Sequence, residues 1–197
     1  IEAVPEDMRI KQAVFRELDE VCPPETIFAS NTSALSISEM ASATKRPHKV
    51  IGMHFFNPAH VMKLVEVIPG EQTDEDTVET VVQFAQELRK LPVTVKECPG
   101  FLVNRLLMPY LNEAVKCLEE GAASASEIDE TMREFGWPMG PFQLMDMRST
   151  EDIPQAHIGK SFPKLFHRSR SGMRSTVFRF YYQEPKALFF QRDGQSV

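Results

Sequence analysis

The sequence predicts an α/β domain followed by a second domain built only from helices. In residues 1–96, short apolar runs alternate with segments of helical periodicity, which is typical of a sheet with at least partly parallel strands. After Pro99-Gly100 the short apolar runs stop and longer helical patterns replace them. The 197 residues are enough for one large domain or two small ones, each with its own core. We place the boundary near residues 96–100.

The first part is predicted to alternate strands and helices, beginning with a strand end at residues 1–5. The expected strands are residues 27–30, 49–55, 63–68 and 92–96. The expected helices are residues 7–21, 36–43 and 74–90. Ser36 and Glu39 have capping-box spacing, and Pro23-Pro24 ends the first helix. Thr73 is the expected cap of the third helix, with Arg89-Lys90 in its last turn, where the helix dipole favours cations.

Three further helices are expected in the second part, at residues 101–120, from Ser124 or Ser126 to 135, and at 142–147. Pro109 lies inside the first of them, where a proline can bend the helix. Gly121 ends that helix, and residues 136–141 form a rigid turn. Residues 148–197 have little periodicity and carry 9 Lys and Arg against 4 Asp and Glu. We expect an atypical basic segment there rather than a nucleic-acid surface.

The composition excludes several classes of protein. The net charge of −6 disfavours a nucleic-acid-binding protein, and no apolar run approaches the length that crosses a membrane. Cys22, Cys98 and Cys117 are scattered, so they predict reduced thiols and no metal site. We therefore expect an intracellular protein, of the cytoplasm in the first instance, with mitochondria or peroxisomes as alternatives.

The most informative pair of residues is His54 and Glu66. His54 lies at the end of one apolar run, and Glu66 lies inside the next, where a carboxylate is costly unless it is paired. Two strands joined by a turn around Asn57-Pro58 would bring the imidazole and the carboxylate together. Such a pair makes a general base that works near neutral pH. The alternative is a structural histidine and a surface carboxylate.

Other polar residues are candidates for a binding site, and each also has a purely structural interpretation. Residues 30–33, Ser-Asn-Thr-Ser, follow the strand 27–30, and ligands of α/β sheets bind beyond the carboxyl ends of strands. A simple turn with capping residues is the competing interpretation. Asn104 interrupts an apolar helix start, either as a binding residue or as a buried structural amide. Glu6 and Lys11 flank the first helix start, where a charged surface is the default.

Together these segments resemble the 3-hydroxyacyl-CoA dehydrogenase family, in order and with the family's spacing, over residues 1–147. The motifs that carry the resemblance are Phe28-Ala29-Ser30-Asn31-Thr32-Ser33, His54-Phe55-Phe56-Asn57-Pro58, Lys63-Leu64-Val65-Glu66-Val67-Ile68, Pro99-Gly100-Phe101-Leu102-Val103-Asn104-Arg105-Leu106 and Pro138-Met139-Gly140-Pro141. The version Phe135-Gly136-Trp137-Pro138 is more similar to the dehydrogenase part of multifunctional β-oxidation enzymes.

The resemblance implies a Rossmann-type NAD-binding domain, here residues 1–97, and a helical dimerisation and substrate domain, here residues 98–147. It implies oxidation of an L-3-hydroxyacyl-CoA to the 3-oxoacyl-CoA with NAD, in a homodimer. His54 matches the catalytic base and Glu66 its orienting carboxylate. The residues that match substrate contacts are Ser33 and Asn104. The residues that match cofactor contacts are Glu6, Lys11, Ser33 and Asn57.

Two departures from the family pattern shape the remaining expectations. No G-x-G-x-x-G occurs in the sequence, so we expect the first βαβ unit to lie upstream of Ile1 and the chain alone to bind NAD poorly. The pattern also fails after Met147. The alternative function is therefore a non-catalytic fragment that serves only as a dimerisation or acyl-CoA-binding module. A dehydrogenase for another hydroxy acid is a third interpretation.

Overall fold

The computed structural model describes the backbone of residues 1–151 and the side chains of residues 1–146, so most of the segment 148–197 lies outside the described residues. The chain divides into two compact units, the first of residues 1–108 and the second beginning at Pro109. No helix of the described residues is long and apolar enough to cross a membrane.

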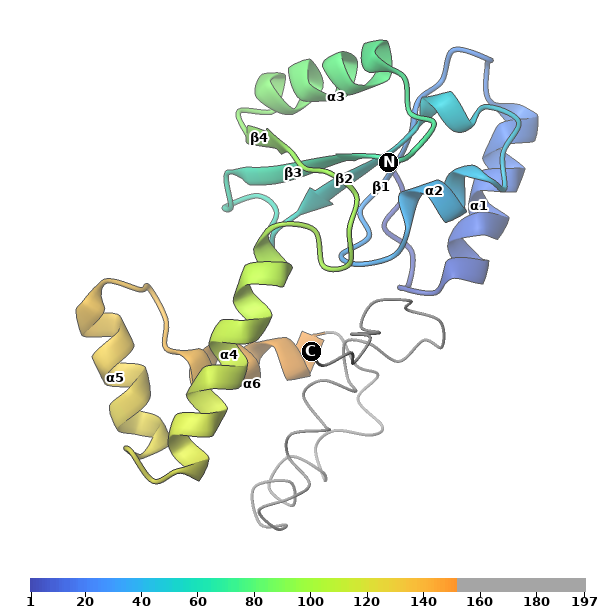
Figure 1. Cartoon of the computed structure of the whole chain (residues 1–197). Helices are drawn as coiled ribbons and strands as arrows, with labels where there is room; N and C mark the ends of the chain where they lie inside the picture. The colour runs from blue at the N-terminus through green and yellow to red at the C-terminus, as the bar shows by residue number, and fades with distance from the viewer. Residues whose placement is uncertain (152–197) are drawn as a thin grey trace, which may run out of the picture. The chain divides into compact units, whose positions relative to one another are not determined.

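The first unit contains a mixed four-stranded sheet (Figure 1). Its strands lie in chain order, β1 (Phe28–Ser30), β2 (Val50–Phe55), β3 (Leu64–Pro69) and β4 (Leu91–Thr94). The pairs β1–β2 and β3–β4 are parallel, whereas β2 and β3 are antiparallel. Glu2 forms a parallel bridge with Ser30 beyond β1, which confirms the strand end expected at residues 1–5.

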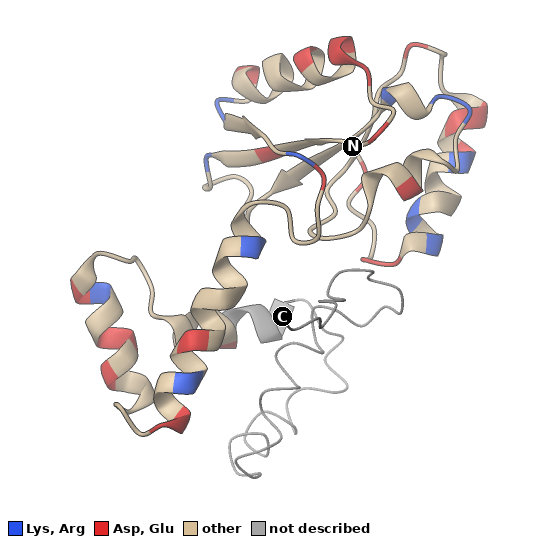
Figure 2. Ribbon diagram, in the orientation of Figure 1, with Lys and Arg blue, Asp and Glu red and all other residues tan. Residues whose placement is uncertain are grey.

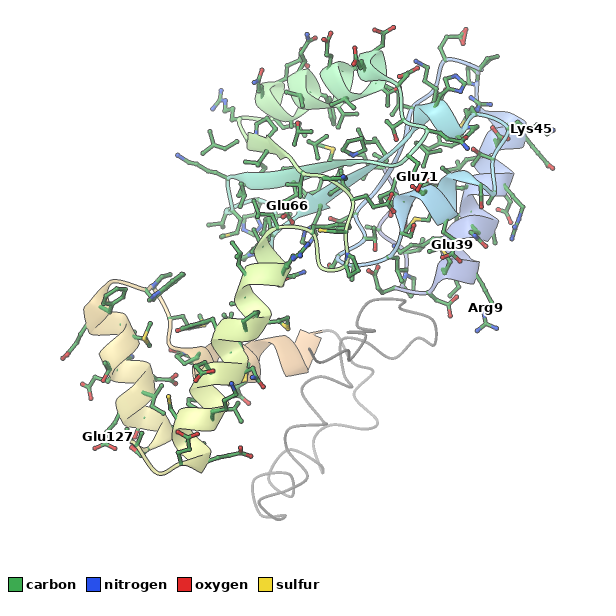
Figure 3. The ribbon with its side chains drawn as sticks, in the orientation of Figure 1. Arg9, Glu39, Lys45, Glu66, Glu71 and Glu127 are labelled. Atoms are coloured by element: carbon green, nitrogen blue, oxygen red, sulfur yellow. The ribbon has the colours of Figure 1, made fainter. Side chains whose placement is uncertain are left out.

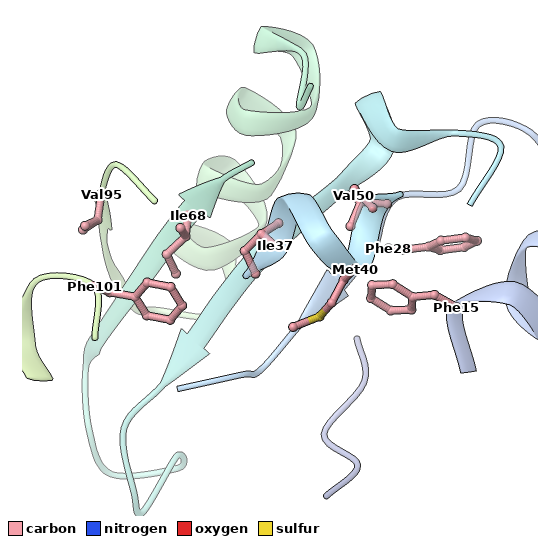
Figure 4. Packing of buried hydrophobic residues seen from close by; sticks show 9 residues of the cluster. Phe15, Phe28, Ile37, Met40, Val50, Ile68, Val95 and Phe101 are labelled. Atoms are coloured by element: carbon pink, nitrogen blue, oxygen red, sulfur yellow. The ribbon is translucent and has the colours of Figure 1, made fainter. Parts of the chain in front are cut away.

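Helices cover both faces of this sheet, as Figure 1 shows. The helices of the first unit are α1 (Met8–Val21), α2 (Ile37–Ala41), the short 3-10 helix η1 (Pro47–Lys49) and α3 (Glu75–Glu87). One core joins α1 and α2 to the sheet and contains Phe15, Phe28, Ile37, Met40, Val50, Ile68, Val95 and Phe101 (Figure 4). The other joins α3 to the opposite face and contains Ala29, Ile51, Met53, Val65, Val67, Val81 and Ala85. The alternation of side chains along β2 and β3 produces this division.

The helix starts follow from local hydrogen bonds. Asp7 caps α1, and Ser36 caps α2 by accepting from the Glu39 N–H, as the spacing predicts. The expected cap of α3 is wrong, because Asp74 accepts the Thr77 N–H at 2.8 Å. The Thr73 hydroxyl instead accepts from Gly70 N–H and donates to the Val50 carbonyl, so it holds the turn after β3.

The end of α3 also differs from the expectation of basic residues in the last turn. The helix ends at Glu87, and the chain leaves it through Arg89, whose φ of 59° is left-handed. The Lys90 N–H then returns to the Ala85 carbonyl at 3.0 Å. The Lys90 ammonium donates to the Met62 carbonyl at 2.8 Å, so its charge serves the neighbouring loop rather than the helix dipole.

Three further helices follow, as predicted: α4 (Val103–Glu119), α5 (Ala125–Phe135) and α6 (Pro141–Glu151). The division between the two units falls within α4, at Pro109. Ser124 opens α5 with a complete capping box. Within the second unit, the Asp129 carboxylate accepts the N–H groups of Phe142 and Gln143 and so fixes the start of α6 against α5.

Candidate functional site

His54 and Glu66 lie directly opposite each other in the antiparallel pair β2–β3. Opposed residues of such a pair project to the same face of the sheet, a few ångströms apart. The Nδ1 atom of His54 is 2.7 Å from Oε2 of Glu66, and both side chains are buried, with exposed fractions of 6% and 1%. The pairing predicted from the two apolar runs is therefore present.

Glu66 is the only Asp, Glu, Lys or Arg in the four described strands, and Figure 2 shows it as a single acidic band within β3. Its second oxygen, Oε1, accepts the backbone N–H groups of Leu102 and Val103, each at 2.9 Å. These N–H groups stand at the start of α4, where the helix dipole favours an anion. Figure 3 labels Glu66 on β3 of the first unit.

The loop before α4 takes an unusual backbone path to deliver these two donors. Gly100 and Phe101 are both left-handed, with φ of 73° and 48°. The first suits glycine, whereas a non-glycine residue there costs about 1 kcal/mol. The ring of Phe101 is buried in the core beside α2 and lies 5.8 Å from the His54 ring, which offsets that cost.

The electrostatics of the pair follow from these contacts. Burial raises the pKa of Glu66, but the hydrogen bonds from His54, Val103 and Leu102, with the charge of His54, lower it more. The net pKa lies below the ordinary glutamate value of 4.5, so the carboxylate is ionised at neutral pH. An ionised carboxylate has no proton to donate, so Glu66 accepts the hydrogen bond from Nδ1 of His54. When His54 is neutral, its proton is therefore on Nδ1, and Nε2 has a lone pair. Nε2 is thus the basic atom of the site.

Residues next to His54 fix its ring and its strand. The Phe56 ring lies 4.7 Å from the imidazole. The Asn31 side-chain oxygen accepts the Phe55 N–H at 2.8 Å, which ties the end of β2 to the residue after β1. Asn57 follows β2 in the exposed turn, and its peptide bond to Pro58 is cis.

Ser33 and Asn104, far apart in sequence, are brought together. The Asn104 side-chain amide donates to the Ser33 carbonyl at 3.3 Å, and Asn104 is buried within the first turn of α4. Asn104 is also adjacent in sequence to Val103, which binds Glu66. The same helix start therefore supports both Glu66 and the turn that carries Ser33.

Glu6 and Lys11 form a second charged cluster that includes Glu2. The Lys11 ammonium lies 3.0 Å from the Glu2 carboxylate, 3.1 Å from the Val4 carbonyl and 3.4 Å from the Glu6 carboxylate, and its side chain is 1% exposed. Glu6 accepts in turn from the Thr32 hydroxyl at 2.6 Å and the Ser33 N–H at 2.9 Å. Lys11 therefore reaches the Ser33 turn through Glu6.

Several residues of this arrangement were missed in the sequence. Glu2 sits in an apolar strand end, which is the signal that identified Glu66, and could have been found. Asn31 was among the candidate residues 30–33, but its hydrogen bond to the Phe55 N–H was not predicted. The N–H groups of Leu102 and Val103 have no sequence signal, because almost every residue carries one. Among the described residues, no group of three or more His, Cys, Asp or Glu side chains could hold a metal ion.

Two family models match the sequence. The model described as "3-hydroxyacyl-CoA dehydrogenase, NAD binding domain" matches residues 1–98, and that described as "3-hydroxyacyl-CoA dehydrogenase, C-terminal domain" matches residues 100–174. The second match continues beyond residue 147, where we expected the resemblance to end. That expectation of an early end is therefore corrected.

Individual relatives agree with the family models. A 3-hydroxybutyryl-CoA dehydrogenase of Clostridioides difficile is 56% identical over 75% of this chain and 53% of the relative. The fatty acid oxidation complex subunit alpha of Pseudomonas savastanoi pv. phaseolicola is 50% identical over 99% of this chain and 26% of the relative. The crystal structure of (S)-3-hydroxybutyryl-CoA dehydrogenase from Ralstonia eutropha has a TM-score of 0.72 and 46% identity, covering 74% of this chain and 52% of that one. The chain thus spans about half the length of two relatives and about a quarter of the third.

The buried Lys11–Glu2 pair yields a prediction about stability. Replacing Lys11 by Met leaves the Glu2 carboxylate buried without its cation, so we expect a loss of about 3–5 kcal/mol in the free energy of unfolding. The double variant Glu2→Gln/Lys11→Met should recover part of this loss, because no unpaired charge remains. Arg9→Ala, at an exposed position on α1, is the control and should cost about 0.5 kcal/mol or less. Urea unfolding measures all three; a Lys11→Met loss no larger than the control would contradict the prediction.

The lowered pKa of Glu66 yields a prediction about pH. A carboxyl group whose pKa is lower in the folded than in the unfolded state stabilises the fold above the unfolded value, and this contribution is lost as pH falls through the folded value. We therefore expect the difference in unfolding free energy between the wild type and Glu66→Gln to have its largest value at neutral pH and to decrease below about pH 4.5. Glu87→Gln, exposed at the end of α3, is the control. A Glu66→Gln difference that stays constant over this range argues against an ionised, hydrogen-bonded Glu66.

Proposed function

The chain belongs to the 3-hydroxyacyl-CoA dehydrogenase family, and on this premise we propose that it carries the catalytic base for the NAD-dependent oxidation of an L-3-hydroxyacyl-CoA to the 3-oxoacyl-CoA, in fatty-acid β-oxidation. The names of the relatives support the reaction and its place in fatty acid oxidation. The observation that carries the proposal is the buried His54–Glu66 pair, whose geometry leaves Nε2 of His54 to act as the base.

The reaction needs such a base because the proton of a secondary alcohol is weakly acidic. Bound NAD would supply the acceptor for the hydride that leaves the carbon bearing the hydroxyl group. Nε2 of His54 takes the hydroxyl proton as the hydride leaves, and His54 becomes an imidazolium. Glu66 stabilises that charge through Nδ1, while the N–H groups of Leu102 and Val103 keep the carboxylate ionised and in place.

We propose that the described residues hold the nicotinamide end of NAD. Ser33 and Asn57 follow β1 and β2, whose parallel carboxyl ends form the usual ligand edge of an α/β sheet. Glu6 lies beside Ser33, so we propose that Glu6, Ser33 and Asn57 contact the cofactor and that Lys11 orients Glu6. The printed sequence holds no G-x-G-x-x-G for the pyrophosphate, so these residues are proposed for this end of NAD alone.

Ser33 and Asn104 are proposed to orient the acyl-CoA. The hydrogen bond from the Asn104 amide to the Ser33 backbone carbonyl brings the two residues together in the first unit. We propose residues 1–97 as the nucleotide-binding part and residues 98–147 as the helical dimerisation and substrate part. The non-catalytic alternative is less favoured, because the His54–Glu66 hydrogen bond and the Asn104–Ser33 hydrogen bond are both formed, as the proposed roles require. We further propose an intracellular site of action, since one relative is named as a peroxisomal enzyme.

A histidine substitution tests the proposed reaction. The assay follows NADH absorbance with 3-hydroxybutyryl-CoA, using the chain alone and the chain fused behind the N-terminal βαβ unit of a family member. In the active form, His54→Gln should lower kcat by about 10²–10⁴-fold, the usual contribution of a general base. His60→Gln is the matched control, because His60 is exposed in the loop after β2 and has no proposed role.

Two results would remove the proposal. One is a kcat for His54→Gln equal to that of His60→Gln. The other is absence of NADH formation in both forms while hydroxyacyl-CoA still binds, which would favour the acyl-CoA-binding module instead. Substrates with longer acyl chains extend the same assay to chain-length preference.

We also propose that the helical part forms a homodimer. Phe135 at the end of α5 is 79% exposed and Trp137 is 49% exposed, which is costly for large aromatic side chains left in water. Sedimentation equilibrium should therefore show a dimer that Phe135→Ser weakens. Phe84→Ser, at a partly exposed position of α3, should leave the dimer unchanged. A monomer at all concentrations contradicts this prediction.

A further inference from the structure

We propose that Glu97 is a positioning residue that holds the loop before α4 and so places the two N–H donors that bind Glu66. Glu97 lies beyond β4, in the loop between Thr94 and Val103, and its carboxylate binds Ser36 and Ser38 rather than His54 or Glu66. The inference deepens the proposed function, on which it rests for the role of His54 as base.

The Glu97 carboxylate is held by two serines near the start of α2. Its Oε1 accepts from the Ser36 hydroxyl at 2.7 Å and the Ser38 N–H at 3.2 Å, and its Oε2 accepts from the Ser38 hydroxyl. The Ser38 hydroxyl also accepts the Glu71 N–H at 2.8 Å, at the turn after β3. One half-buried carboxylate thus joins the loop to α2 and to the end of the strand that carries Glu66.

The loop needs such an anchor because its own backbone does not favour the observed path. Gly100 and Phe101 are left-handed in succession, and the second is a non-glycine residue, for which this conformation is strained. The Val95 N–H binds the Val67 carbonyl at 2.8 Å, and the Phe101 ring is buried. Between these two points the loop is fixed by Glu97 and by the Phe101 N–H, which binds the Cys98 carbonyl at 3.0 Å.

The consequence for the site is geometric. Leu102 and Val103 follow this loop directly, and each donates to Oε1 of Glu66 at 2.9 Å. Hydrogen bonds of this kind weaken steeply once distance and angle depart from their optimum. Freeing the loop at Glu97 therefore weakens both donors and raises the pKa of Glu66 towards its ordinary value, without removing any residue that touches the substrate.

Hydrogen exchange in the 197-residue chain tests this inference without requiring turnover. In Glu97→Ala, the amides of Leu102 and Val103 should exchange about tenfold faster or more, while those of Met53 and Val67 in the centre of the sheet stay unchanged. The carboxyl carbon of Glu66, followed by NMR, should titrate at higher pH. Glu97→Gln should restore both readouts, because its amide has the same shape and can bond to both serines. Glu79→Ala, on the exposed face of α3, is the control.

The opposite results overturn the inference. These are unchanged exchange at Leu102 and Val103 in Glu97→Ala, or an equal increase at Met53 and Val67, which assigns Glu97 a general structural role. If Glu97→Ala does not fold, Ser38→Ala decides the question, since it removes one partner of Glu97 and predicts the same selective pattern. Selective loosening in the 197-residue chain, together with no NADH formation by either form in the dehydrogenase assay, would refute the proposed reaction but leave the positioning of Glu66 by Glu97 intact.

Discussion

The carboxylate of Glu66 is the point on which the first unit depends, because its two oxygens join the sheet at β2 to the start of α4. One oxygen binds His54 on the neighbouring strand, and the other binds the start of α4. A carboxylate buried in a sheet is tolerable only with such partners. The contacts that satisfy Glu66 as a buried anion are also those that orient the imidazole, so stability and chemistry here have the same physical origin.

Much of this could be predicted from the sequence. Apolar runs and helical spacing located the four strands and six α-helices to within a few residues, because each element buries a face whose period is visible. His54 and Glu66 were identified since a carboxylate within an apolar strand requires a partner. Ser33 and Asn104 were identified through residue type and through the family resemblance. The cap of α3 was mispredicted because Thr73 and Asp74 are both good capping residues. The Thr73 hydroxyl is occupied by the Gly70 N–H and the Val50 carbonyl, and the bond to Val50 forms only in the completed fold.

The residues that could not be predicted act through the backbone or through distant partners. Leu102 and Val103 contribute N–H groups, and the left-handed Phe101 that aims them has no residue-type signal. The sequence alone gives Glu97 no sign of a partner, because Ser36 and Ser38 lie some sixty residues away along the chain. Lys11 reads as part of a charged helix face, whereas it is almost fully buried between Glu2 and Glu6. Such long-range pairings depend on the completed fold.

The position of Glu66 in β3 also restricts how the sheet can assemble. A slip of one residue between β2 and β3 would turn every side chain of β3 to the opposite face. Val65 and Val67 could exchange sides with Ile68 at modest cost, since both faces are apolar. Glu66 could not, because it would enter the core beneath α3, among Val81 and Ala85, with no imidazole and no helix start to receive it. The charge that we propose to orient the catalytic base thus also selects the correct alignment of two otherwise interchangeable apolar strands.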